Sequence, residues 1–328
     1  MHLSRDVILL LTHSEDYFTI DRVAAALSRR GARPFRLDTD LFPTTVRLAA
    51  SLSNEETSYR LSYGEESIVT EQVRSVWMRR LWQPRLSQKL APFFQAACIR
   101  ESMTALNNFL GGLRNARWVD RLSLIDRAEN KLQQLIVAKE IGLRIPRTLM
   151  TNNPDEVREF FQAVRGNMVA KLLTPLSAGM QGSAFFLYTS KVEPEDLLAA
   201  DALRYSPMVF QEQIPKQREL RAVFVAGKLF VGVLNASRYA ATNMDWRNAA
   251  PEACQWERGE LPSEITRRLC SLMATFGLTF GAFDLIQTPD NEYVFLEVNP
   301  TGEWGMLERD LGYPIADAIA DALLTESK

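Results

Sequence analysis

The first forty residues alternate between apolar runs and one helical pattern. Residues 7–11 are all apolar, apolar side chains recur at helical spacing over residues 20–27, and residues 34–38 extend the chain again. This order predicts a βαβ unit. Further alternating stretches, expected to supply the remaining strands of the same small sheet, lie at residues 46–49, 59–62 and 73–80.

Helices and strands continue to alternate along the rest of the chain. A linking helix is expected over residues 92–113 and a second helix over residues 125–142. Further helices are expected at residues 155–164, near 194–198 and at 264–276. Strands are expected at residues 148–150, 168–173, 184–188, 208–215, 220–225, 229–234, 281–286 and 293–298. The pattern therefore predicts a mixed α and β architecture.

The composition changes this picture only by excluding other classes of protein. The chain has 328 residues, which suggests two or three domains at roughly 150 residues each. Apolar residues make up 46% and charged residues 24%, which excludes a disordered or fibrous chain. The apolar runs are far shorter than the roughly 20 residues of a membrane span, and no signal peptide pattern is present. We therefore expect a cytoplasmic protein with no membrane partner.

Charge and rare residues exclude further classes of function. The formal net charge of −2 provides no positive field toward nucleic acid. Three widely spaced cysteines rule out a disulfide framework or a zinc knuckle. The two histidines, His2 and His13, leave little scope for a histidine metal site or a Ser-His-Asp triad.

Three oxygen-bearing side chains are expected to meet at the C-terminal hairpin. The turn brings Asp284 opposite the end of the next strand, and alternation places Glu297 and Asn299 on one face. Carboxylates among apolar residues are costly unless they are paired or bind a metal. Oxygen ligands favour Mg²⁺, which usually also binds substrate phosphates. The alternative is that an arginine or the backbone satisfies the carboxylates.

Two lysines support nucleotide binding. Lys171 lies in an apolar strand, where an ammonium requires an anion such as phosphate. Lys131 begins an amphipathic helix, where a solvated surface charge is the alternative. The loop over residues 174–183 is rich in small residues but lacks the P-loop pattern, and it is our candidate for a lid.

The order of these residues resembles that of the ATP-grasp carboxylate-amine ligases over most of residues 120–325. The resemblance implies ATP and Mg²⁺ as cofactors, with the metal on Asp284, Glu297 and Asn299. The residues that it implies for nucleotide binding are Lys131, Lys171, Gln211, Glu212, Gln213, Ile214 and Glu219.

Individual roles follow from the same resemblance. The backbone at Glu212 and Ile214 is expected to meet adenine, and Glu219 the ribose. Arg221 and Lys171 are the expected catalytic residues, and Arg221 is expected to stabilise the phosphate and the activated carboxyl. Arg247 is a further candidate for contact with phosphate or substrate.

Four segments narrow the resemblance to the microviridin-type graspetide ligases, and the whole chain looks closest to the macrolactam-forming members. These segments are residues 10–14, 35–40, 77–80 and 302–308. The family implies a three-part α/β (α+β) ATP-grasp fold with an N-terminal βαβ pre-ATP-grasp domain, a central domain and a C-terminal antiparallel-sheet domain. The expected domains are residues 1–122, 123–207 and 208–328.

The resemblance also implies a peptide substrate. ATP would phosphorylate an Asp or Glu side chain of a ribosomal precursor peptide, and a Lys amine of the same peptide would then close a macrolactam. Glu195 and Asp196 are expected to contact the leader of this peptide, although they would equally complement a helix N-terminus. Candidate contacts to the core peptide are Arg79, Arg80 and Glu303.

Two alternatives stay open. A ligase that adds a free amino acid to a protein or a small carboxylate would turn over ATP without a leader. A peptide-binding protein with the same fold would not turn over ATP, but the intact acidic set and both lysines argue against it. Similar enzymes are dimers, so a homodimer is expected.

Overall fold

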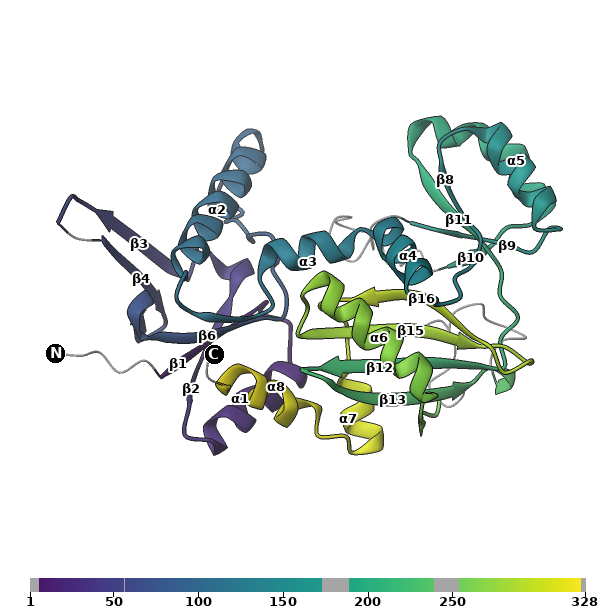
Figure 1. Ribbon diagram of the computed structural model, residues 1–328. Coiled ribbons are helices and arrows are strands. Elements are labelled where there is room, and N and C mark those ends of the chain that lie inside the picture. The colour runs from purple at the N-terminus through teal and green to yellow at the C-terminus, as the bar shows by residue number, and fades with distance from the viewer. Residues whose placement is uncertain (1–5, 56, 173–188, 239–253, 326–328) are drawn as a thin grey trace.

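The computed structural model describes residues 6–55, 57–172, 189–238 and 254–325. Figure 1 shows an N-terminal unit, a small central sheet and a larger C-terminal sheet, which follow one another along the chain. This arrangement agrees with the predicted three-part fold. Within the described ranges, every helix is too short or too polar to cross a membrane.

A parallel sheet of order β2-β1-β6-β7 forms the N-terminal unit. Its strands are β1 (Val7–Thr12), β2 (Arg33–Asp38), β6 (Val73–Met78) and β7 (Arg117–Val119). Helix α1 (Thr19–Arg29) connects the first two strands, which confirms the predicted βαβ unit. Strand β1 is an inner strand with six buried side chains, which explains its uninterrupted apolar run.

A separate antiparallel sheet contains two of the stretches that were expected in the first sheet. It is formed by β3 (Arg47–Leu52), β4 (Thr57–Tyr63) and β5 (Glu66–Val69). The expectation of a single sheet was therefore wrong. Strand β3 is almost fully exposed, whereas the inner strands of a parallel sheet are buried on both faces. Helix α2 (Pro92–Gly112) follows as predicted.

The helix predicted over residues 125–142 is instead two helices, α3 (Leu122–Glu129) and α4 (Lys131–Glu140). Asn130 separates them because its backbone is extended. Its side-chain oxygen accepts a hydrogen bond of 3.0 Å from the backbone N–H three residues later. This cap begins α4 at Lys131.

The central sheet is antiparallel, with the order β10-β9-β11-β8. Its strands are β8 (Thr148–Thr151), β9 (Met168–Lys171), β10 (Ser190–Lys191) and β11 (Met208–Glu212). Helix α5 (Pro154–Ala163) packs against the 3₁₀ helix η3 (Pro194–Tyr205). Because β11 pairs with both β8 and β9, this sheet extends past the expected domain boundary at residue 207.

The C-terminal sheet has the order β14-β13-β12-β15-β16 and confirms both predicted hairpins. Its strands are β12 (Arg218–Val225), β13 (Lys228–Asn235), β14 (Glu257–Arg258), β15 (Phe280–Gln287) and β16 (Tyr293–Asn299). Helix α6 (Ser263–Phe276) packs against α3 and α4. Strand β16 also contacts α3 and α4, so the sheet meets the helices that precede the central unit.

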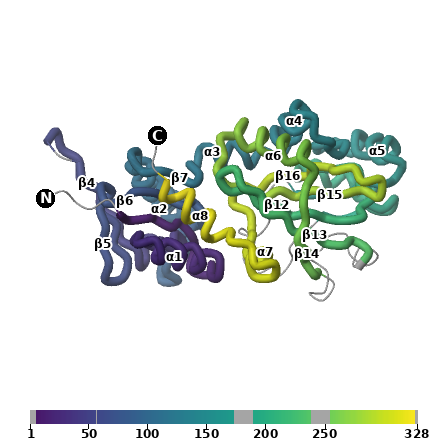
Figure 2. The backbone as a smooth tube through the Cα atoms, turned by 60° about the horizontal axis from the view of Figure 1, so that its bottom comes forward, coloured from purple at the N-terminus to yellow at the C-terminus, as the bar shows by residue number. Residues whose placement is uncertain are grey.

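Two C-terminal helices that the sequence pattern did not predict, α7 (Gly305–Leu311) and α8 (Ile315–Leu324), return the chain to the N-terminal unit. Figures 1 and 2 show α8 beside α1. One buried cluster combines Leu10 of β1, Val223 of β12 and Ile319 of α8. The first and last units therefore share a hydrophobic core.

Candidate active site

The pairing of β15 with β16 brings together the side chains of Asp284, Glu297 and Asn299, which we call the triad. Asp284 lies opposite Glu297, and Asn299 lies two residues further along β16. The Asn299 amide nitrogen donates to Glu297 Oε1 at 3.1 Å and to Asp284 Oδ2 at 3.5 Å. The three side chains therefore converge as predicted, with a register shift between Asp284 and Leu285 that sets Asp284 opposite Glu297. The role of the triad as metal ligands stays a prediction.

Each carboxylate of the triad faces a cation. Lys131 Nζ lies 2.8 Å from Glu297 Oε2 and donates to Asn299 Oδ1 at 3.0 Å. Arg221 Nη1 lies 2.7 Å from Asp284 Oδ1. The second ion pair is also what the alternative, a carboxylate satisfied by arginine, would show.

Glu297 remains ionised in this environment. Burial alone would raise its pKa, but the ammonium groups of Lys131 and Lys171 hold the pKa of Glu297 well below its usual range. Lys171 ends β9, so the central sheet adds positive charge to the same corner. Among the described residues, no three His, Cys, Asp or Glu side chains cluster around a metal position. Two carboxylates and one amide are nevertheless hard oxygen donors that fit Mg²⁺.

A short segment after β11 connects the central and C-terminal sheets. Gln211 is buried, and its side-chain nitrogen donates to Thr148 Oγ1 at 3.1 Å. The backbone N–H of Gln213 donates to the carbonyl oxygen of Asn167 at 2.8 Å. Ile214 packs against buried residues of β15 and β16. These contacts fix the segment from Gln211 to Ile214, which we call the hinge, and its contact with adenine stays a prediction.

Of the two predicted acidic nucleotide residues, Glu212 lies within the hinge and Glu219 lies beyond it on β12. The backbone N–H of Glu212 donates to the carbonyl oxygen of Arg147 at 2.9 Å. The carboxylate of Glu219 pairs with Lys216, and both side chains are largely buried. The predicted nucleotide residues therefore lie on β9, β11, the segment after it and β12, apart from Lys131 on α4, and their contact with a nucleotide stays a prediction.

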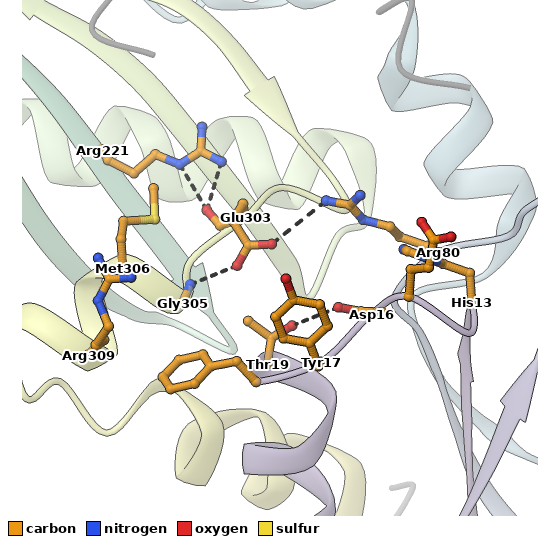
Figure 3. A pocket seen from close by; sticks show the side chains of 12 residues that line it. His13, Asp16, Tyr17, Thr19, Arg80, Arg221, Glu303, Gly305, Met306 and Arg309 are labelled. Carbon is orange, nitrogen blue, oxygen red and sulfur yellow. Dashed lines mark hydrogen bonds and ion pairs between the residues drawn. The ribbon is translucent and has the colours of Figure 1, made fainter. Parts of the chain in front are cut away.

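A pocket of about 750 Å³ opens beside Arg221 (Figure 3). Its walls come from the loop between β1 and α1, from Arg80 after β6, and from residues between Glu303 and Arg309. Tyr17 projects into it with 77% of its surface exposed. The pocket thus lies between the N-terminal unit and the C-terminal residues around Arg221.

The pocket loop has a strained backbone that the sequence analysis missed. Phe18 has φ 65° and ψ −72°, and the N–H of Thr19 donates to the carbonyl oxygen of Tyr17 at 2.9 Å. This is a γ-turn with positive φ, which is rare and concentrates at ligand-binding sites. No spacing of residue types in the sequence signals such a turn.

Arg79 lies beneath the pocket, with 1% of its side chain exposed. Its guanidinium pairs with the Glu303 carboxylate and donates to the carbonyl oxygen of Thr301 at 2.8 Å. The structure therefore does not present Arg79 to a peptide, because its donors face inward. Arg80 is 34% exposed and lies in the pocket wall, 3.7 Å from the same carboxylate. Burial would raise the pKa of Glu303, but Arg79 and two backbone amides hold this pKa below its usual value.

The candidate leader contacts lie in the first turn of η3. Asp196 Oδ2 accepts a hydrogen bond of 2.8 Å from the backbone N–H of Glu193, which is the capping role considered as the alternative. Glu195 is exposed beside it. Arg247 and the predicted lid at residues 174–183 lie outside the described residues, as does the strand expected at 184–188.

Comparison with known families decides the class of this site. The RimK-like ATP-grasp domain matches residues 128–323, and the MvdD pre-ATP grasp domain matches residues 7–126. The chain belongs to the RimK-like ATP-grasp family. ATP-grasp members are ATP-dependent ligases that use Mg²⁺, so the predicted fold and cofactors are confirmed.

Solved structures similar to this ATP-grasp chain include two macrocyclases from Microcystis aeruginosa MRC. MdnB is 54% identical with a TM-score of 0.85, and MdnC, bound with precursor peptide MdnA, is 33% identical with a TM-score of 0.88. Both alignments cover 98% of this chain and 100% of the other.

Two further relatives of this ATP-grasp chain carry other descriptions. A RiPP-associated ATP-grasp ligase from Chryseobacterium gregarium, in complex with ADP and a leader and core peptide, is 30% identical with a TM-score of 0.89; 97% of this chain and 96% of that chain are covered. A probable alpha-L-glutamate ligase of Vibrio atlanticus (strain LGP32) is 22% identical over 98% of this chain and 96% of its own length.

Proposed function

We propose that this ATP-dependent ligase closes a macrolactam in a ribosomally made precursor peptide. The observation that carries the proposal is 54% identity to a macrocyclase over 98% of the chain, in a structure whose triad adjoins a pocket large enough for peptide side chains. Two other relatives are described with bound precursor or leader and core peptides, which supports a peptide as the substrate.

The proposed site activates a carboxyl group of the peptide. When bound, ATP with its Mg²⁺ supplies the phosphoryl group that turns an Asp or Glu side chain of the peptide into a reactive acyl phosphate. The triad would hold the cations, and Lys131 and Lys171 would hold the phosphates. The hinge from Gln211 to Ile214 would bind the adenine ring, and Glu219 would bind the ribose.

Arg221 lies where the triad meets the pocket. It would steady negative charge that develops at the activated carboxyl while a Lys amine of the peptide attacks from the pocket. In well-oriented intramolecular reactions, holding the amine and the carboxyl together lowers the activation barrier by up to about 7–11 kcal/mol. The reaction therefore does not require a strong general base. Arg80 and Tyr17 would line the path of the core peptide. Arg247 and the candidate lid stay proposals from the family resemblance.

A free-amino-acid ligase is the second candidate. It is favoured by the curated relatives described as probable alpha-L-glutamate ligases, one of which aligns over 98% of this chain at 22% identity. Such an enzyme would consume ATP with glutamate and a carboxylate acceptor, and a leader would have no effect.

Mass spectrometry separates these candidates. The protein is incubated with ATP, Mg²⁺ and a leader-bearing precursor whose core contains Lys, Asp and Glu. The proposal expects loss of one water for each ring, in a linkage that survives mild base as an amide does. ATP consumption with an unmodified precursor, or a linkage cleaved by mild base, would contradict it. Homodimer formation, cytoplasmic location and the absence of nucleic-acid binding remain predictions.

A further inference from the structure

The loop at residues 301–305 lies between two arginines that come from different units of the molecule. From the N-terminal unit, Arg79 donates to the carbonyl oxygen of Thr301 at 2.8 Å and pairs with the Glu303 carboxylate. From the C-terminal sheet, Arg221 donates through Nε and Nη2 to the carbonyl oxygen of Glu303 at 3.2 and 2.8 Å. Glu303 is therefore held by its side chain on one side and by its backbone on the other.

The carboxylate of Glu303 also shapes the loop from within. Its Oε1 accepts hydrogen bonds from the backbone N–H groups of Trp304 at 3.0 Å and Gly305 at 2.9 Å, where α7 begins (Figure 3). At Gly302, a Cβ atom would lie 2.8 Å from Nη2 of Arg221. The loop backbone consequently sits against the Arg221 guanidinium with no space for displacement toward it.

Arg221 has two kinds of anchor. Its Nη1 meets the triad at Asp284 Oδ1, 2.7 Å away, while Nε and Nη2 meet the loop. Its side chain is 5% exposed, so these hydrogen bonds and the ion pair fix the orientation of the guanidinium relative to the pocket. A change in the loop would rotate the guanidinium relative to the triad.

We propose that Arg79 and Glu303 are positioning residues that hold the 301–305 loop against Arg221. Through this loop, the N-terminal unit fixes the position of the Arg221 guanidinium, beside the place where the peptide carboxyl is activated and attacked by the amine. The inference rests on the proposed function. It replaces the expectation that Arg79 contacts the core peptide, because Arg79 is buried, whereas Glu303 also lines the pocket and its contact with the peptide stays a prediction.

The test compares Arg79→Lys and Glu303→Gln with the wild type in ring closure. Misplacement of about 1 Å at a reacting centre lowers rates by about 10²-fold, so we expect kcat to fall by about that factor. The KM values for ATP and for the precursor should change by less than about threefold, because the binding contacts remain. The double variant should be no slower than the slower single variant, because both changes act through one loop.

Arg22→Gln is the matched control. Arg22 Nε pairs with Glu308 Oε1 at 2.7 Å and also connects the N-terminal unit with α7, but it does not touch the 301–305 loop. Its kcat should stay within about twofold of the wild type, as expected for a partly exposed ion pair. An equal fall of kcat in this variant would show that any weakened contact between the units slows the reaction, and would overturn the specific role of the loop.

A crystal structure of Arg79→Lys provides a readout that does not depend on activity. We expect the 301–305 loop to be displaced and the contact between Arg221 Nη2 and the Glu303 carbonyl oxygen to be lost. An unmoved loop overturns the inference, as does an unchanged kcat, or a raised KM for the precursor with normal kcat, which would assign Arg79 to the peptide. A wild type that closes no ring would instead contradict the proposed function, and the crystal structure would then decide the inference alone.

Discussion

Ion pairs in the site are better explained by chemistry than by stability. The side chains of Arg221 and Asp284 are 5% and 17% exposed, and removing two such charges from water costs about as much as their attraction returns. Apolar residues of similar volume would hold β12 and β15 together equally well. Charges at this position are therefore expected to serve a ligand that carries charge of its own.

The residue-scale prediction concerns Glu297. Glu297→Gln removes the charge that faces Lys131 and is expected to lower ring closure by at least about 10²-fold, measured as the rate of water loss from the precursor. Leader binding should be unchanged. Glu292→Gln on the same hairpin is the control, because that carboxylate is 57% exposed and pairs with Arg144. A normal rate for Glu297→Gln would refute the metal assignment.

Side chains that share one strand or one hairpin could be predicted from the sequence. Strand alternation places Glu297 and Asn299 on one face, whereas a register shift between Asp284 and Leu285, which the sequence does not signal, sets Asp284 opposite Glu297. The environment of Arg79 and the exposure of Tyr17 depend on which distant loop covers each position. No local pattern contains that information.

At the scale of elements, the cap of α4 places Lys131 beside the triad. Asn130→Ala removes this cap and should lower the free energy of unfolding by about 1 kcal/mol in urea titrations. It should also raise the KM for ATP. Asn153→Ala removes the equivalent cap of α5, whose side-chain oxygen accepts a 3.0 Å hydrogen bond, and should cost similar stability with a normal KM. Equal KM values in both variants would contradict a special role for Asn130.

The 3₁₀ helix η3 carries the prediction about leader binding. Glu195→Lys is expected to weaken leader affinity by about tenfold, or about 1.4 kcal/mol, in a fluorescence titration, with ATP binding unchanged. Asp196 is less suitable because it caps the helix. Asp201→Lys, an exposed carboxylate further along η3, controls for net charge. Unaltered leader affinity in Glu195→Lys would remove this assignment.

Elements with one strong period could be predicted, whereas breaks between similar elements could not. The βαβ opening and both C-terminal hairpins follow from local patterns. The break at Asn130 was missed because helical spacing continues across it, and only the cap contact reveals it. The antiparallel sheet of β3, β4 and β5 was misplaced because exposed alternation does not specify the partner strand.

At the scale of the whole molecule, α8 makes the N-terminal unit and the C-terminal sheet one folded body. Its contacts with α1 and β6 join residues that are more than two hundred positions apart in the chain, and it also contacts β7 and β12. The sequence divides into three regions, but this shared core arises only from tertiary packing. The pocket at the same junction therefore depends on both units.

Acid is expected to destabilise this body through His13. The ring stacks on Trp82 with centroids 3.7 Å apart, and burial lowers the pKa of His13 below its ordinary value of 6.5, although Asp16 and Asp40 oppose the change and Arg79 and Arg80 add to it. The unfolded chain then binds the proton first as the pH falls below 6.5, so stability decreases in that window. Urea unfolding at about pH 7.5 and about pH 5.5 should show the loss, and His13→Gln should reduce it. Equal pH dependence in this variant would contradict the account.

The central claim is that the triad holds the cations that accompany the nucleotide, beside a pocket for the peptide. The most direct test is anomalous diffraction from crystals soaked with Mn²⁺ and a non-hydrolysable ATP analogue. We expect an anomalous peak bounded by Asp284, Glu297 and Asn299, with the terminal phosphate directed toward Arg221. A fully occupied nucleotide with no peak there, and with the carboxylates still paired to Arg221 and Lys131, would contradict the claim.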